Sequence, residues 1–181
     1  MDSTLVIWVV IILAVLVVVA LVTKRRRTNQ LKSRFGPEYT HALEQTGSRI
    51  KTEAQLHERE TRVGKLPIRP ISSGDRDRFV ETWRRVQEEF VDDPQGAVTR
   101  ADSLLGDVMT IRGYPVSDFE QRSADLSVDY PIVVQNYRAA HDIAIRHRRG
   151  EAGTEDLRRA MIHYRSLFEE LVQEPTTDVV R

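Results

Sequence analysis

The sequence predicts an all-α protein with a single N-terminal transmembrane helix, a stalk helix and then a compact bundle of four or five helices. Three observations predict this class. An unbroken apolar run lies near the N-terminus, and the apolar residues after it recur at spacings of three and four. No stretch alternates with period two over the length of a strand, and no internal repeat is visible.

The first element is the apolar run Leu5–Val22, whose eighteen residues would span roughly 27 Å as a helix, close to the thickness of a bilayer core. A membrane anchor, a cleaved signal peptide and a buried helix all fit such a run. Residues 1–4 carry no basic side chain, and residues 20–23 form a poor cleavage site, which argues against a signal peptide. A soluble helix is rarely apolar on every face. We therefore predict a transmembrane anchor over residues 1–23.

Basic residues follow the run and predict its orientation. By the positive-inside rule the N-terminus lies outside and the C-terminal domain is cytoplasmic, so the protein is expected in the cell membrane as a single-pass protein. The same side chains are the predicted contacts with anionic lipid headgroups. They are Lys24, Arg25, Arg26, Arg27, Lys32 and Arg34.

The neutral total charge hides two regions of opposite sign. Residues 24–70 carry twelve Lys and Arg against five Asp and Glu, a net of +7, whereas residues 71–181 carry fifteen against twenty-one, a net of −6. A basic segment beside a membrane favours the lipid bilayer as a partner. The acidic distal part would repel phosphate, so we expect no nucleic acid.

Residues 24–71 are predicted to form a basic juxtamembrane stalk and a proline-containing strap. The stalk helix is expected from Pro37 to Arg62, because Gly36 and Pro37 interrupt the preceding helix and Pro37 suits a first helical position. The two prolines in residues 64–71 force an extended course. That segment is expected to lie on the domain through its aliphatic side chains, Leu66, Ile68 and Ile71.

The bundle is assigned to residues 72–174, with residues 175–181 as a disordered tail. Its helices are marked by apolar stripes. The clearest stripes are Phe79, Trp83, Val86 and Phe90 in the first helix, Ala97, Ala101, Leu104, Leu105, Val108 and Met109 in the second, Val133, Val134, Tyr137, Ala140, Ala144 and Ile145 in the fourth, and Leu157, Met161, Tyr164, Phe168 and Leu171 in the last. Ser117 and Glu120 form a capping box that opens the short third helix.

No catalytic signature is present. The sequence contains no Gly-rich phosphate loop, no GxSxG and no HExxH. It has no cysteine, and the spacing of its five histidines does not suit a helical metal site. We therefore expect no catalytic residue, no cofactor, no metal and no enzyme.

One polar segment is the candidate surface for a ligand or a partner. In it, Arg122 is expected to bridge to Asp118 or Asp125, a role that is more often structural than chemical. The candidate residues are Tyr114, Asp118, Arg122, Asp125 and Tyr130.

Several motifs resemble a family of small bacterial membrane-anchored proteins, usually labelled hypothetical or secreted. These motifs are RFGPEY at 34–39, FVDDP at 90–94, RGYP at 112–115, DFEQR at 118–122 and YRAAH at 137–141. The resemblance implies a bacterial origin and the same layout of an anchor followed by helices. It implies no activity and no functional residue.

The leading hypothesis is a membrane-tethered helical module that binds a protein partner or associates with itself. An enzyme or small-ligand sensor with an unrecognised site is one alternative. An exported envelope or stress protein with the opposite topology is the other.

Overall fold

The computed structural model describes residues 3–115 and 117–173. Over these residues the backbone forms eight helices and no strand, which agrees with the predicted all-α class. The chain divides into two compact units, unit 1 (residues 1–56) and unit 2 (residues 57–181).

The first helix, α1 (Ser3–Phe35), joins the apolar run and the basic residues after it in one continuous element. The described large apolar side chains of the run are exposed. They are Trp8, Ile11, Ile12, Leu13, Val15, Leu16, Val18, Val19, Leu21 and Val22.

The prediction of a membrane anchor is corrected by the structure. A search of the described residues finds no helix that has both the length and the apolar character needed to cross a membrane. The anchor over residues 1–23, the cell-membrane location and the orientation with a cytoplasmic C-terminal domain are therefore wrong. The apolar run is the first part of a 33-residue helix whose second part is strongly polar.

The predicted stalk helix is two helices, α2 (Pro37–Thr46) and α3 (Arg49–Val63). Gly47 separates them because it adopts a left-handed conformation with φ of 62°, and its amide donates to the carbonyl of Leu43 at 2.9 Å. The expected continuous helix from Pro37 to Arg62 is thus wrong at its centre. Gly36, with φ of 47°, makes the turn from α1 into α2.

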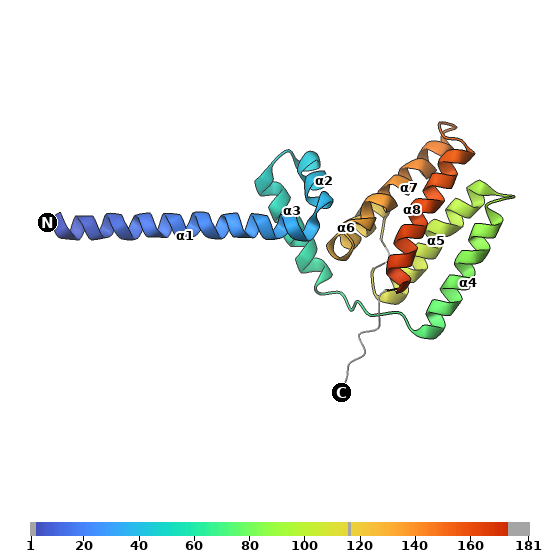
Figure 1. Ribbon diagram of the computed structural model, residues 1–181, viewed down its shortest axis with the longest axis horizontal. Helices are drawn as coiled ribbons and strands as arrows, with labels where there is room; N and C mark the ends of the chain where they lie inside the picture. Colours follow the sequence, from blue (N-terminus) through green and yellow to red (C-terminus); the bar gives the residue numbers. More distant parts are fainter. Residues whose placement is uncertain (1–2, 116, 174–181) are drawn as a thin grey trace. The chain divides into compact units, whose positions relative to one another are not determined.

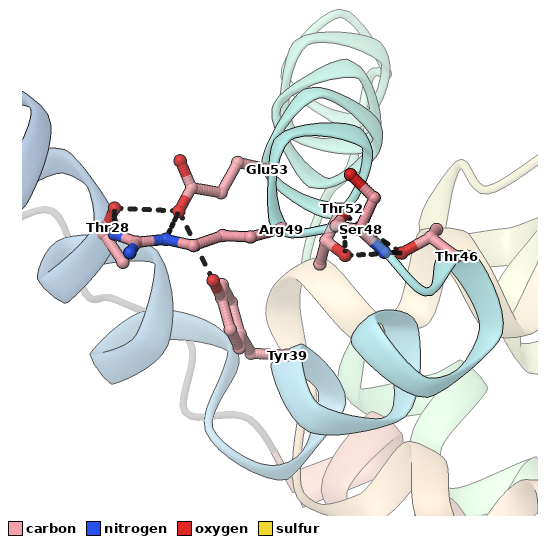
Figure 2. A network of polar contacts seen from close by, with 7 residues as sticks. All are labelled: Thr28, Tyr39, Thr46, Ser48, Arg49, Thr52 and Glu53. Atoms are coloured by element: carbon pink, nitrogen blue, oxygen red, sulfur yellow. Dashed lines mark hydrogen bonds and ion pairs between the residues drawn. The ribbon is translucent and has the colours of Figure 1, made fainter.

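A polar network joins the three helices of unit 1 (Figure 2). The Oε1 atom of Glu53 accepts from Thr28 at 2.8 Å, from Arg49 Nε at 2.9 Å and from Tyr39 at 3.3 Å. Burial alone would raise the pKa of Glu53, but the hydrogen bonds from Arg49 and Thr28 lower it below its usual value. Burial and the Glu53 carboxylate together raise the pKa of Tyr39. The network holds α1, α2 and the start of α3 in one unit.

Unit 2 contains the end of α3 and five further helices, in agreement with the expected four or five. They are α4 (Ser73–Glu89), α5 (Pro94–Arg112), α6 (Phe119–Asp129), α7 (Val133–Arg148) and α8 (Thr154–Gln173). Figure 1 shows α8 beside α5 and α7, and α4 beside α5.

Short polar side chains cap the N-termini of α4, α5 and α6, as expected. Ser72 Oγ accepts from the Asp75 amide at 3.1 Å, and the Asp93 carboxylate accepts from the Gly96 amide at 2.9 Å. The predicted capping box at Ser117 is wrong by one residue. Asp118 is the N-cap of α6 and accepts from the Gln121 amide at 2.8 Å.

The core of unit 2 follows the predicted stripes closely. Its largest fully buried side chains include Tyr137, Tyr164, Leu105 and Leu167. Trp83 of α4 stacks on Phe168 of α8 with ring centroids 4.7 Å apart. In α7, Ile143 is buried in place of the predicted Ile145.

The predicted strap is confirmed. Leu66 and Ile68 pack against the core of unit 2, and Ile71 is buried in it. The Arg69 amide donates to the carbonyl of Arg112 at 2.9 Å, which ties the strap to the end of α5. A Cβ atom at Gly113 would lie 2.4 Å from the carbonyl oxygen of Pro67, so only glycine allows this approach.

Candidate functional site

The five residues predicted as a ligand or partner surface do not form one surface. Tyr114, Asp125 and Tyr130 are buried. The Tyr114 hydroxyl donates to Asp129 at 2.7 Å, and burial raises its pKa above the usual value. Arg112 lies over the ring of Tyr130, 5.6 Å from its centroid. These contacts hold elements of unit 2 together.

Asp125 is paired with an arginine other than the predicted Arg122. Its Oδ1 atom accepts from Arg62 Nε at 2.8 Å, from Arg62 Nη2 at 2.6 Å and from Gln121 Nε2 at 3.0 Å. Asp118 serves as the N-cap of α6. Arg122 instead reaches α5, where its Nη1 lies 3.3 Å from the place that a Cβ atom would take on Gly106. The predicted bridge from Arg122 to Asp118 or Asp125 is not among the contacts that the structure describes for Arg122.

A buried polar cluster that the sequence did not reveal joins α5, α6, α7 and α8. The Tyr137 hydroxyl donates to Asp102 at 3.3 Å, and burial raises the pKa of Tyr137 and of Tyr164. His141 stacks on Phe119 with ring centroids 3.6 Å apart. Burial also lowers the pKa of His141. The cluster connects four helices and is best described as structural.

The basic residues predicted to contact lipid headgroups lie on the second half of α1. Arg25, Arg26, Arg27, Lys32 and Arg34 are exposed, and the side chain of Lys24 is outside the described part. Lys32 Nζ lies 5.4 Å from the centroid of the Tyr39 ring. The headgroup role was inferred from the membrane anchor, so the correction of the anchor removes its basis.

An open groove between α4 and α8 is the strongest candidate site. Its volume is about 200 Å³. The two helices run in opposite directions, since Trp83 meets Phe168 whereas Phe90, further along α4, lies beside Met161, further back along α8. The lining residues are Gln87, Phe90, Arg158, Met161, Ile162 and Arg165. The stack of Trp83 on Phe168 therefore lies further along the two helices than the groove, seven residues from Phe90 and from Met161, and the groove is on the side of the stack nearer the end of α4.

Exposed aliphatic side chains distinguish this groove. Ile162 is 61% exposed, and Val91, next to the groove residue Phe90, is 83% exposed. Large apolar side chains at such exposure mark contact surfaces when they lie together and polar residues surround them. Met161 and Ile162 are adjacent in the sequence, and one of them is buried and the other exposed. The periodicity of apolar residues does not show which of the two side chains is exposed to solvent.

Two arginines stand at the rim of the groove. Arg158 Nε lies 3.7 Å from Glu155, and Arg165 Nε lies 2.7 Å from Glu169. Both ion pairs lie within α8 and are exposed to solvent. Each therefore contributes little to stability, and a carboxylate of a partner could replace either glutamate at small cost. The groove therefore offers an apolar floor between two exposed arginine side chains.

A second groove lies between α4 and α5, with a volume of about 380 Å³. Phe79 and Leu104 form its floor and are buried. Its rim is mixed: Arg78 is paired with Asp75 at 2.8 Å, and the hydroxyls of Thr82 and Thr110 donate to carbonyls of their own helices. The lining residues are Arg78, Phe79, Thr82, Leu104, Asp107, Thr110 and Ile111. None of its lining residues is among the exposed large apolar side chains, whereas Ile162 lines the first groove, so this groove is the weaker candidate.

Metal chemistry finds no support in the side chains that the structure describes, which contain no group of three His, Cys, Asp or Glu placed to hold an ion. The resemblance to a bacterial family stays a prediction. Comparison of the chain with protein-family models, with curated proteins and with solved structures finds no match.

Proposed function

We propose that this protein is a helical protein-interaction module that binds a segment of another protein in the groove between α4 and α8. The observation that carries the proposal is the exposed Ile162, which lies between the rim residues Arg158 and Arg165. Laying an apolar segment into a groove between two helices is a recurring mode of peptide recognition.

The energetics suit a short partner segment. Covering Ile162 removes most of an isoleucine side chain from water, which is worth about 2 kcal/mol. The floor is rigid at Met161, which is buried in the core of unit 2. A rigid floor avoids the entropic cost of ordering side chains on binding. A groove of about 200 Å³ takes a few side chains, which fits a transient contact better than an obligate one.

The enzyme or ligand-sensor alternative depended on a shared pocket near Tyr114, Asp118 and Arg122. Tyr114 is buried against Asp129, Asp118 is occupied as a helix cap, and Arg122 points to α5. No observation on the described residues favours this alternative over the interaction module.

Site-specific crosslinking tests the proposal. The photoreactive amino acid p-benzoylphenylalanine replaces Ile162 in the full-length protein, and the cells that make the protein are irradiated. Ile132, an isoleucine 73% exposed just before α7, is the matched control position. We expect a discrete covalent adduct with another protein from position 162 and none from position 132.

A second variant keeps this test independent of the label at Ile162. The crosslinker at position 87, an exposed residue of α4 that lines the groove, should give the same adduct, and Ile162→Asp should remove it. An adduct that forms equally from positions 162 and 132, or none from positions 162 and 87, would overturn the proposal. Circular dichroism of the Ile162→Asp variant must match the native spectrum.

A further inference from the structure

We infer that the groove recognises an amphipathic helix whose acidic side chains stand seven residues apart on either side of an aliphatic pair. This inference rests on the proposed function and adds the chemistry of the partner. It follows from the order of residues along α8. Arg158, Met161, Ile162 and Arg165 lie at positions i, i+3, i+4 and i+7, which share one face of a helix.

The spacing of the two arginines sets the spacing of the partner's carboxylates. Seven residues are nearly two turns, so Arg158 and Arg165 are separated by roughly 10.5 Å along α8. A helix that lies along α8 repeats the same distance between its own residues i and i+7. Glutamates at those positions would meet the two guanidinium groups, and aliphatic residues at i+3 and i+4 would cover Ile162.

The charges at the rim are available to a partner although each has a neighbour in α8. Arg158 and Arg165 are 65% and 57% exposed, and their partners Glu155 and Glu169 are 74% and 43% exposed. A guanidinium group has five N–H donors and serves a second carboxylate without giving up the first. Since the pairs are exposed, the charges confer selectivity and orientation more than affinity.

A second copy of this chain does not fit the same face. The order arginine, apolar pair, arginine reads the same in both directions along α8. Two copies related by a two-fold axis through this face would therefore place Arg158 of one copy opposite Arg165 of the other. Like charges at a contact are repulsive, so the face favours a partner of opposite charge.

Peptide binding to the full-length protein tests the inference. The protein is kept in a mild nonionic detergent, which covers the exposed apolar side chains of α1. The acidic probe is a labelled eighteen-residue helical peptide with Glu at i and i+7 and Leu at i+3 and i+4. The basic probe carries Lys at both Glu positions. A third peptide moves the second Glu to i+5. Binding is measured by fluorescence anisotropy.

We expect the acidic probe to bind about tenfold more tightly than either of the other two, because two exposed ion pairs together are worth on the order of 1.4 kcal/mol. The preference should shrink at 0.5 M salt, where charges are screened. The double variant Arg158→Glu, Arg165→Glu should reverse it, and Ile162→Asp should abolish binding of all three.

The matched control is the double variant Arg78→Glu, Arg85→Glu. These arginines are also seven residues apart, are 64% and 66% exposed, and are paired with carboxylates of their own helix, α4. This variant should keep the native preference for the acidic probe.

The outcomes separate the inference from the proposed function. Equal binding of acidic and basic probes, or a preference that survives the reversal of Arg158 and Arg165, overturns the inference alone if crosslinking from position 162 still succeeds. Failure of both crosslinking and peptide binding overturns the proposed function as well. A concentration-dependent dimer that Ile162→Asp dissociates would identify a second copy as the occupant and overturn the inference.

Discussion

Replacing Gly113 by alanine should detach the strap from the end of α5. Gly113 has φ of 98°, and a Cβ atom there would lie 2.4 Å from the carbonyl oxygen of Pro67. That overlap is with backbone, so the strap itself must shift. The hydrogen bond from the Arg69 amide to the Arg112 carbonyl, now 2.9 Å, would be lost with it.

The magnitude follows from two contributions. An L-residue in the left-handed region costs about 1–2 kcal/mol, and loss of a backbone hydrogen bond costs about 1 kcal/mol more. We therefore expect Gly113→Ala to lower the free energy of unfolding of unit 2 by about 2–3 kcal/mol. Urea denaturation of the full chain, followed by circular dichroism, measures the change.

Gly150 supplies the matched control. Its φ is 75°, but nothing lies within 4 Å of a Cβ atom built there. Gly150→Ala should therefore cost only the backbone strain, about 1–2 kcal/mol. Hydrogen exchange gives a local readout. The amide proton of Arg69 should exchange faster with solvent in Gly113→Ala, and its exchange rate should be unchanged in Gly150→Ala. Equal losses of stability in the two variants, or an unchanged Arg69 amide, would refute the role of Gly113 in holding the strap.

Three further predictions concern the buried polar groups of unit 2. Asp102→Ala should lower the free energy of unfolding by about 2 kcal/mol, because the buried Tyr137 hydroxyl loses its acceptor; an unchanged urea midpoint would contradict this. Burial raises the pKa of Tyr114, so the unfolded chain loses this proton first and stability should fall above about pH 10; Tyr114→Phe should flatten that fall between pH 9 and 11, and an unaltered slope would rule it out. Burial lowers the pKa of His141, so the unfolded chain binds a proton more readily and stability should decline below about pH 6.5; His141→Phe should reduce the decline, and an identical pH profile would count against it.

The features that the sequence predicted correctly are local ones. The spacing of Phe79, Trp83 and Val86 places all three in the core, because helical periodicity is written in neighbouring residues. Asp93 before Pro94 marks a helix start for the same reason. The strap also followed from local signals, since the aliphatic side chains of Leu66 and Ile68, on either side of Pro67, would be exposed to water if the segment were a free linker.

The predictions that failed concern features that depend on residues far apart in the sequence, or on a choice between two local conformations of similar energy. The partner of Asp125 is Arg62, 63 residues away, whereas the sequence suggested the nearby Arg122. Gly47 ended a helix that periodicity alone would have continued. The groove depends on how far α4 separates from α8 beyond the stack of Trp83 on Phe168, and no pattern within one helix contains that information.

The stack of Trp83 on Phe168 also supplies an optical reporter. The chain has two tryptophans, and they differ sharply: Trp8 of α1 is 63% exposed, whereas Trp83 of α4 is 6% exposed. In a Trp8→Phe background all indole fluorescence would come from Trp83, which lies one helical turn before the groove residue Gln87. Its emission wavelength and quenching by acrylamide would then follow occupancy in the unlabelled protein, at concentrations well below those that calorimetry needs.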